Sequence, residues 1–270
     1  MIKNLDFLGV IFPTPKLITK KRLACQCSLP CLQMNKTTLL TRSKHSVMNK
    51  TISKLALGSA NFGFDYGLTN TSGKISKSEL KNILFLAERS GIEVVDTAQA
   101  YGDSEKRLGA LCCDGRFKFV TKIGVSLDEG FEKNSLNKIV EQSRKRLNQS
   151  RLYAIMLHRP EVLLGDKGST IIKELQWLKD LNIVSKVGIS IYSPEILEEV
   201  SKILQLDIIQ APFNIFDQQI LLSGWSDKLK ENGVEIHTRS VFLQGLLLLE
   251  KLNLPDYFIK HWPAHFDTWV

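Results

Sequence analysis

The feature that most constrains the fold is a series of polar residues that directly follow short apolar segments. Asp96, Lys122 and His158 each come at the end of a β-type run, and Tyr101 lies shortly after Asp96. Such runs alternate with amphipathic stretches of helical periodicity. In a parallel barrel the carboxyl ends of all strands meet at one mouth, so these four side chains are expected to gather there.

Seven strand and helix units can be placed along the chain. The predicted strands cover residues 54–58, 92–96, 117–122, 153–158, 184–190, 206–210 and 234–239, and the helices cover 76–89, 104–112, 134–148, 169–181, a segment opening at Pro194 as its first residue, and 218–232. Right-handed connection of such units gives a barrel or an open doubly wound sheet. The barrel is favoured, because residues 58–63 lack the third glycine of a dinucleotide-binding turn. We therefore predict a TIM-type (β/α)8 barrel.

The first 47 residues differ in composition from the rest of the chain. They are basic, rich in Ser and Thr, and nearly free of acidic residues. A transit peptide, a disordered arm and an artefactual extension upstream of Met48 all fit this composition, and we favour the extension because a strand begins soon after Met48. The expected division is a leader over residues 1–47 and one barrel domain over residues 48–270.

Charge and cysteine content limit the classes of partner. The formal net charge is +8, but residues 1–50 alone hold nine Lys and Arg against one Asp, so the remaining chain is neutral on balance. No nucleic-acid surface and no membrane span is predicted. Five cysteines without a repeated CxxC spacing favour free thiols in a cytoplasmic protein. Cys25, Cys27 and Cys31 offer no fourth ligand at a helpful spacing, so no metal site is expected.

The four polar residues suggest carbonyl chemistry. A lysine ammonium close to a tyrosine lowers the pKa of the phenol, and an aspartate holds the lysine charged and oriented. Tyr101 would then be a usable proton donor, and a neutral His158 would orient a carbonyl oxygen. None of the side chains can supply a hydride, so this reaction requires a nicotinamide cofactor.

The same residues resemble the aldo-keto reductase family. The resemblance rests on residues 95–105, 121–124 and 157–160, where Asp96, Tyr101, Lys122 and His158 match the family's catalytic tetrad in order and spacing. Further likeness continues from about residue 53 towards the C-terminus. The resemblance implies a barrel that uses NADPH, or less often NADH, to interconvert small aldehydes or ketones and alcohols. It also implies that Tyr101 is the general acid and base, tuned by Lys122 and Asp96.

The resemblance further implies a set of residues that hold the cofactor. These are Gly58, Ser59, Ser190, Gln210, Arg239 and Ser240. Ser190 and Gln210 match the positions that hold the nicotinamide carboxamide, and Arg239 and Ser240 lie beside the nicotinamide and pyrophosphate. The segment 58–67 resembles a bacterial branch often associated with surface-sugar biosynthesis, which is a hint of substrate.

Three departures from the family pattern bear on function. Ile191 stands where the family commonly has Asn, and Arg239 stands where many members stack an aromatic ring on the nicotinamide. After the seventh strand, no counterpart is found for the family's eighth strand and helix or for the basic stretch that grips the adenosine 2'-phosphate. We therefore expect a C-terminally truncated barrel. A non-catalytic barrel protein or an inactive fragment is the alternative function, while the sequence leaves the oligomeric state open.

Overall fold

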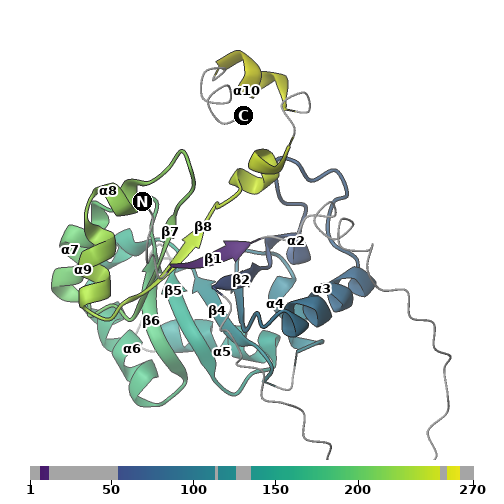
Figure 1. Cartoon of the computed structure of the whole chain (residues 1–270). Helices are drawn as coiled ribbons and strands as arrows, with labels where there is room; N and C mark the ends of the chain where they lie inside the picture. The colour runs from purple at the N-terminus through teal and green to yellow at the C-terminus, as the bar shows by residue number, and fades with distance from the viewer. Residues whose placement is uncertain (1–6, 12–53, 113–114, 126–134, 250–253, 262–270) are drawn as a thin grey trace, which may run out of the picture.

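The computed structural model forms a closed barrel of eight parallel strands that pair in chain order (Figure 1). It describes residues 7–11, 54–112, 115–125, 135–249 and 254–261. The strands are β1 (Phe7–Ile11), β2 (Leu55–Gly58), β3 (Val94–Ala98), β4 (Lys118–Ile123), β5 (Leu152–Leu157), β6 (Val184–Ser190), β7 (Ile208–Pro212) and β8 (Glu235–Arg239). The TIM-type barrel predicted from the sequence is therefore confirmed.

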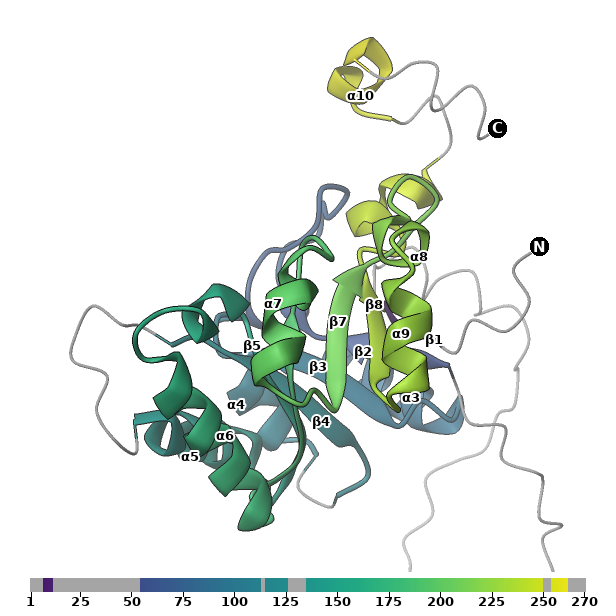
Figure 2. The same cartoon turned by 90° about the vertical axis from the view of Figure 1, so that its left-hand side faces the viewer.

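Helices lie outside the strands and cover the barrel (Figures 1 and 2). They are α2 (Ala60–Gly63), α3 (Lys77–Arg89), α4 (Ser104–Gly109), α5 (Ser135–Leu147), α6 (Gly168–Asp180), α7 (Ile196–Ile203), α8 (Gln219–Leu222) and α9 (Trp225–Glu231). The 3-10 helix η1 (Pro160–Leu163) follows β5, while η2 (Leu243–Leu248) and α10 (Asp256–His261) follow β8. Within the described ranges, no helix is both long and apolar enough to cross a membrane.

Local sequence explains where the helices begin and end. The Ser76 side chain accepts a hydrogen bond from the Glu79 amide and so caps the start of α3. Two predicted boundaries are wrong. Pro194 lies before α7, which begins at Ile196, and the single helix expected over 218–232 is divided into α8 and α9. The division occurs at Gly224, whose φ of 76° lies in the left-handed region and interrupts a helix.

The core has an inner and an outer layer. The barrel interior is filled by small and medium apolar side chains, namely Ala56, Val94, Val120, Ala154, Met156 and Ile208. A larger apolar cluster lies between the strands and the surrounding helices. At Gly188 a Cβ atom would lie 1.7 Å from the Ile208 carbonyl oxygen, so β6 and β7 tolerate no side chain there. This rigid packing fixes the positions of the strand ends that carry the site.

The N-terminal strand corrects the predicted domain division. β1 pairs in parallel with β8 on one side and with β2 on the other, and thereby closes the barrel (Figure 1). The expectation that residues 1–47 lie outside the fold is wrong for Phe7–Ile11. This apolar run has only five residues and lies within a basic segment, so the composition of the segment as a whole does not indicate a strand. Cys25, Cys27 and Cys31 lie outside the described residues.

Candidate functional site

A buried ion pair lies at the carboxyl-terminal mouth of the barrel. Lys122 Nζ lies 2.6 and 2.8 Å from the two carboxylate oxygens of Asp96, and both side chains are 1% exposed. The ammonium also donates to the Thr97 carbonyl oxygen at 3.2 Å. Burial lowers the pKa of Lys122, although the charge of Asp96 opposes that shift. The pair is therefore shielded from bulk solvent, and each charge depends on the other.

Two glycines place Tyr101 beside this pair. A Cβ atom on Gly63 would lie 1.6 Å from the Tyr101 carbonyl oxygen, and Gly102 has a φ of +55°. The turn after β3 therefore packs directly against the end of α2. Lys122 Nζ lies 5.2 Å from the centroid of the Tyr101 ring. This distance places the ammonium close enough to interact with charge that develops on the phenol.

The pKa of Tyr101 differs from the sequence-based expectation. Burial raises the pKa of Tyr101 strongly, the charge of Asp96 raises it further, and Arg239 opposes the shift. The net shift is thus opposite to the expectation that Lys122 lowers this pKa. The physical reason is that burial of the phenol outweighs the nearby positive charge, and the charge of Asp96 adds to the upward shift. Tyr101 keeps its proton at neutral pH.

His158 completes the group of four. Its ring lies 6.5 Å from that of Tyr101, centroid to centroid, with the two planes nearly perpendicular. Burial lowers the pKa of His158, and the charge of Lys122 lowers it further. The imidazole is therefore neutral at neutral pH and can donate one hydrogen bond to a bound oxygen. The structure thus brings together all four residues that the sequence placed at the mouth.

Ser190 and Gln210 lie side by side at the ends of β6 and β7, where they are register partners. Gln210 Nε2 donates to Asp96 Oδ1 at 2.9 Å, which ties this amide to the ion pair. The other amide atom, Gln210 Oε1, is buried and has no hydrogen-bond partner among the described residues. A buried acceptor without a partner is costly, so this oxygen suits a ligand N–H group. A nicotinamide carboxamide carries such a donor.

Gly58 and Ser59 lie deeper than the other predicted cofactor residues. Gly58 is the register partner of Asp96 within the sheet. The Ser59 hydroxyl accepts from Ser104 Oγ at 2.9 Å, and the Ser59 amide donates to the Asp96 carbonyl oxygen. The side chain of Ser59 is fully buried. In this structure the Ser59 hydroxyl therefore joins β2 to α4.

Arg239 and Ser240 lie at the end of β8, on the rim of the mouth. The Arg239 guanidinium stacks 4.4 Å from the centroid of the Tyr192 ring and donates to the Ile191 carbonyl oxygen at 3.1 Å. Ser240 has a φ of 57° and accepts from Arg239 at 3.4 Å. Arg239 is thus oriented by the loop after β6, and its charge acts on Tyr101 and His158.

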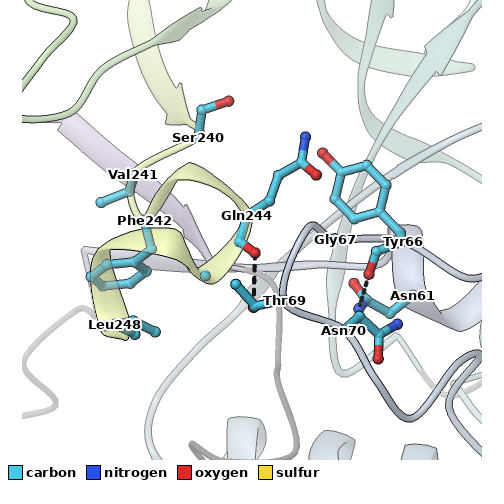
Figure 3. A pocket seen from close by; sticks show the side chains of 11 residues that line it. Asn61, Tyr66, Gly67, Thr69, Asn70, Ser240, Val241, Phe242, Gln244 and Leu248 are labelled. Carbon is cyan, nitrogen blue, oxygen red and sulfur yellow. Dashed lines mark hydrogen bonds between the residues drawn. The ribbon is translucent and has the colours of Figure 1, made fainter. Parts of the chain in front are cut away.

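A pocket opens beside this rim, between the segments that follow β2 and β8 (Figure 3). One wall contains Asn61, Tyr66 and Thr69, and the other runs from Ser240 to Leu248. Thr69 Oγ1 donates to the Gln244 carbonyl oxygen at 3.1 Å and joins the two walls. Ser240 belongs to this pocket, whereas Gly58 and Ser59 do not line it. The pocket is therefore formed by two segments that are far apart in the sequence.

Two mouth residues were not assigned a role from the sequence. Burial raises the pKa of Tyr66, and the nearby Tyr101 raises it further, so the two phenols lie within electrostatic reach. Tyr192 is 74% exposed and supports Arg239. Tyr66 lies in the segment 58–67, which resembles a bacterial branch of the family. Tyr192 lies in a loop, where the sequence shows no periodicity that could indicate a role. Within the described part of the chain, no group of three potential metal-binding side chains is found.

Comparison with known proteins gives a consistent result. The sequence model of the Aldo/keto reductase family matches residues 54–269. The uncharacterized oxidoreductase YqkF of Bacillus subtilis is 26% identical over 73% of this chain, and the match spans 66% of that relative. A solved aldo-keto reductase from Bacillus halodurans has a TM-score of 0.61 and 22% identity, covering 76% of this chain and 67% of its own. A glycerol dehydrogenase from Gluconobacter oxydans gives a TM-score of 0.62 and 23% identity, covering 81% and 71%.

Proposed function

Because this chain belongs to the aldo-keto reductase family of oxidoreductases, we propose that it reduces a small aldehyde or ketone to an alcohol with NADPH, and that Tyr101 donates the proton. The observation that supports this most is the buried Lys122–Asp96 pair beside Tyr101 and His158 at one mouth. The bound nicotinamide would supply the hydride, which no side chain of this chain can provide.

The carbonyl oxygen of the substrate would lie between Tyr101 and His158. Neutral His158 donates a hydrogen bond to it and fixes its position, because its lowered pKa keeps the ring uncharged. Negative charge then develops on this oxygen, and Tyr101 gives it a proton. Lys122, 5.2 Å from the ring, stabilises the phenolate that remains. Asp96 keeps the ammonium in place and charged.

The protonation state of Tyr101 suits the reduction half-reaction. Its raised pKa keeps the hydroxyl protonated at neutral pH, so the proton that reduction consumes is in place before the substrate binds. The same shift makes the phenol a weaker acid, so proton transfer would be driven by the negative charge that develops on the carbonyl oxygen.

The cofactor would be held by the unpaired amide oxygen of Gln210 and by residues at the rim of the barrel mouth. Gln210 Oε1 would accept from the carboxamide, next to Ser190, and Arg239 and Ser240 would lie beside the nicotinamide and phosphates. Gly58 would form part of the floor below the ring. NADH is the alternative cofactor, and a parallel titration with NADPH and NADH decides between them.

The first test is Tyr101→Phe, which removes the hydroxyl and keeps the ring. We expect kcat for reduction, screened over small aldehydes, ketones and aldoses, to fall by about 10³-fold or more. NADPH binding, followed by nicotinamide fluorescence, should change less than about 3-fold, since binding does not use the phenol proton. Reduction at an unchanged rate would contradict the assigned donor.

Tyr153→Phe is the matched control. The Tyr153 hydroxyl donates to Glu235 Oε2 at 2.6 Å, near the opposite end of the barrel from Tyr101. The same atom is removed, but far from the mouth, so the turnover rate should remain close to that of the wild type. A comparable loss in both variants would mean that general destabilisation, and not loss of the proton donor, explains the effect.

A further inference from the structure

The two walls of the pocket in Figure 3 follow two strands that do not pair with each other. One wall follows β2 and the other follows β8. In the sheet, β1 lies between these two strands and forms a parallel hydrogen-bonded pair with each of them. The separation of the walls is therefore set by a five-residue strand from the N-terminal segment (Figure 1).

The register shows how β1 joins the two strands. Phe7, Leu8 and Gly9 pair with residues 236–238 of β8, and Gly9, Val10 and Ile11 pair with residues 55–57 of β2. Gly9 is therefore opposite a residue of each neighbour. β1 continues towards the same end of the barrel as Arg239 and Ser240, which lie directly after the paired part of β8.

The edges of β8 and β2 that pair with β1 are buried. His237, the partner of Leu8, and Ala56, the partner of Val10, are both fully buried, and Thr238 is 3% exposed. A buried backbone N–H or C=O group needs a hydrogen-bond partner, and an unpaired strand edge would leave several without one. β1 supplies these partners for both strands.

We propose that residues 7–11 of the same chain, docked as β1, hold the two walls of this pocket at their working distance. The inference rests on the proposed function, which places NADPH beside Ser240, a residue of one wall. Without β1, the Thr69 to Gln244 hydrogen bond would be left to join the two rims at the pocket. Since coupling between two binding events is reciprocal, bound NADPH strengthens the docking of β1.

Val10→Pro and Val10→Ala in the full chain test this proposal. Both substitutions remove the branched valine side chain, but proline also removes the backbone N–H and with it a ladder hydrogen bond. Without cofactor, hydrogen–deuterium exchange in β2 and β8 should become at least 10-fold faster in Val10→Pro and should change less than 3-fold in Val10→Ala. Equal protection in both variants would overturn the docking of β1.

The affinity for NADPH provides a second readout. We expect the Kd to rise at least 10-fold in Val10→Pro and less than 3-fold in Val10→Ala. An unchanged Kd together with faster exchange in β2 and β8 would overturn the link to the pocket. If neither the wild type nor any variant binds NADPH or NADH, the proposed function fails, while the exchange data still decide whether β1 docks.

A cleavage experiment identifies the occupant and does not depend on a destabilising variant. A protease site is inserted between Leu23 and Ala24, in the connection between β1 and β2. After cleavage, the N-terminal piece should co-elute with the barrel at the mass of a single chain. Release of the piece would overturn the docking. Co-elution at the mass of two chains, with exchange of labelled pieces between copies, would overturn the assignment to the same chain.

Discussion

Two of the lysine–carboxylate pairs in this barrel differ in their electrostatics, one at the mouth and one near the amino-terminal ends of the strands. Lys122 and Asp96 are each 1% exposed, whereas Lys186 and Glu235 are 30% and 25% exposed. Burial lowers the pKa of Lys122 in spite of its partner. For Lys186, hydrogen bonds with Glu235 and Tyr153 outweigh the effect of burial and raise the pKa.

The surroundings of the carboxylates account for the difference. Burial alone would raise the pKa of Glu235, but hydrogen bonds from His237, Lys186 and Tyr153 lower it to about 2. Asp96 receives hydrogen bonds from Lys122 and Gln210 and is itself 1% exposed. A buried pair incurs a large desolvation cost that offsets the attraction between its charges, so its net contribution to stability is small. A partly hydrated network contributes more. The lower pair therefore contributes more to stability, while the proposed function gives the mouth pair a role in chemistry.

The largest expected effect is that of Asp96→Asn, which leaves the buried ammonium of Lys122 without its counter-charge. We expect the free energy of unfolding to fall by about 3–5 kcal/mol, because an uncompensated buried charge carries the full desolvation cost. Urea denaturation measures the change. The double variant Asp96→Asn with Lys122→Met should regain most of this stability without regaining activity. A loss below about 1 kcal/mol in the single variant would mean that water reaches the pair.

A smaller, pH-dependent effect is expected for Glu235→Gln. The pKa of Glu235 is lowered from 4.5 to about 2, so its stabilisation is present above about pH 4.5 and is lost as the pH falls towards 2. We expect the wild type to lose about 2 kcal/mol more than the variant between about pH 5 and pH 2, measured by denaturation at each pH. Parallel profiles for the two proteins would contradict the network.

Glu88→Gln is the control for that comparison. Glu88 pairs with Arg116 at 3.1 Å, and both side chains are more than 40% exposed. Exposed pairs contribute about 0–1 kcal/mol, so this variant should stay within about 0.5 kcal/mol of the wild type at pH 7. Measured beside Glu235→Gln, it separates the effect of the network from that of removing any surface carboxylate.

The smallest effect is expected for Lys186→Met. Its ammonium is partly hydrated, and Glu235 keeps the hydrogen bonds from Tyr153 and His237 after the substitution. We expect the free energy of unfolding to fall by about 1 kcal/mol or less, and the turnover rate to stay close to that of the wild type. A thermal or urea melt is sufficient. A loss above about 3 kcal/mol would place this pair in the same class as Lys122–Asp96.

Seven of the strands and the clustering of Asp96, Tyr101, Lys122 and His158 could be predicted from the sequence. Each of these strands except the last is followed by an amphipathic helix, and the alternation of periods is a local property. β1 was missed because residues 12–54 separate it from its neighbour β2, so no local pattern linked it to the barrel. The Ser59 hydroxyl was expected at the cofactor but bonds to Ser104, a contact between distant residues.

The sequence alone determined the barrel class, the order of the strands from β2 to β8, and the family to which the chain is related. These follow from periodicity and from residue types at strand ends, which are encoded over a few neighbouring residues. Tertiary structure alone decided that β1 closes the barrel, that Gln210 joins the Asp96 pair, and that the pKa of Tyr101 is raised. Closure, hydrogen bonding and desolvation depend on residues far apart in the chain, and their sum is set only when the strands meet.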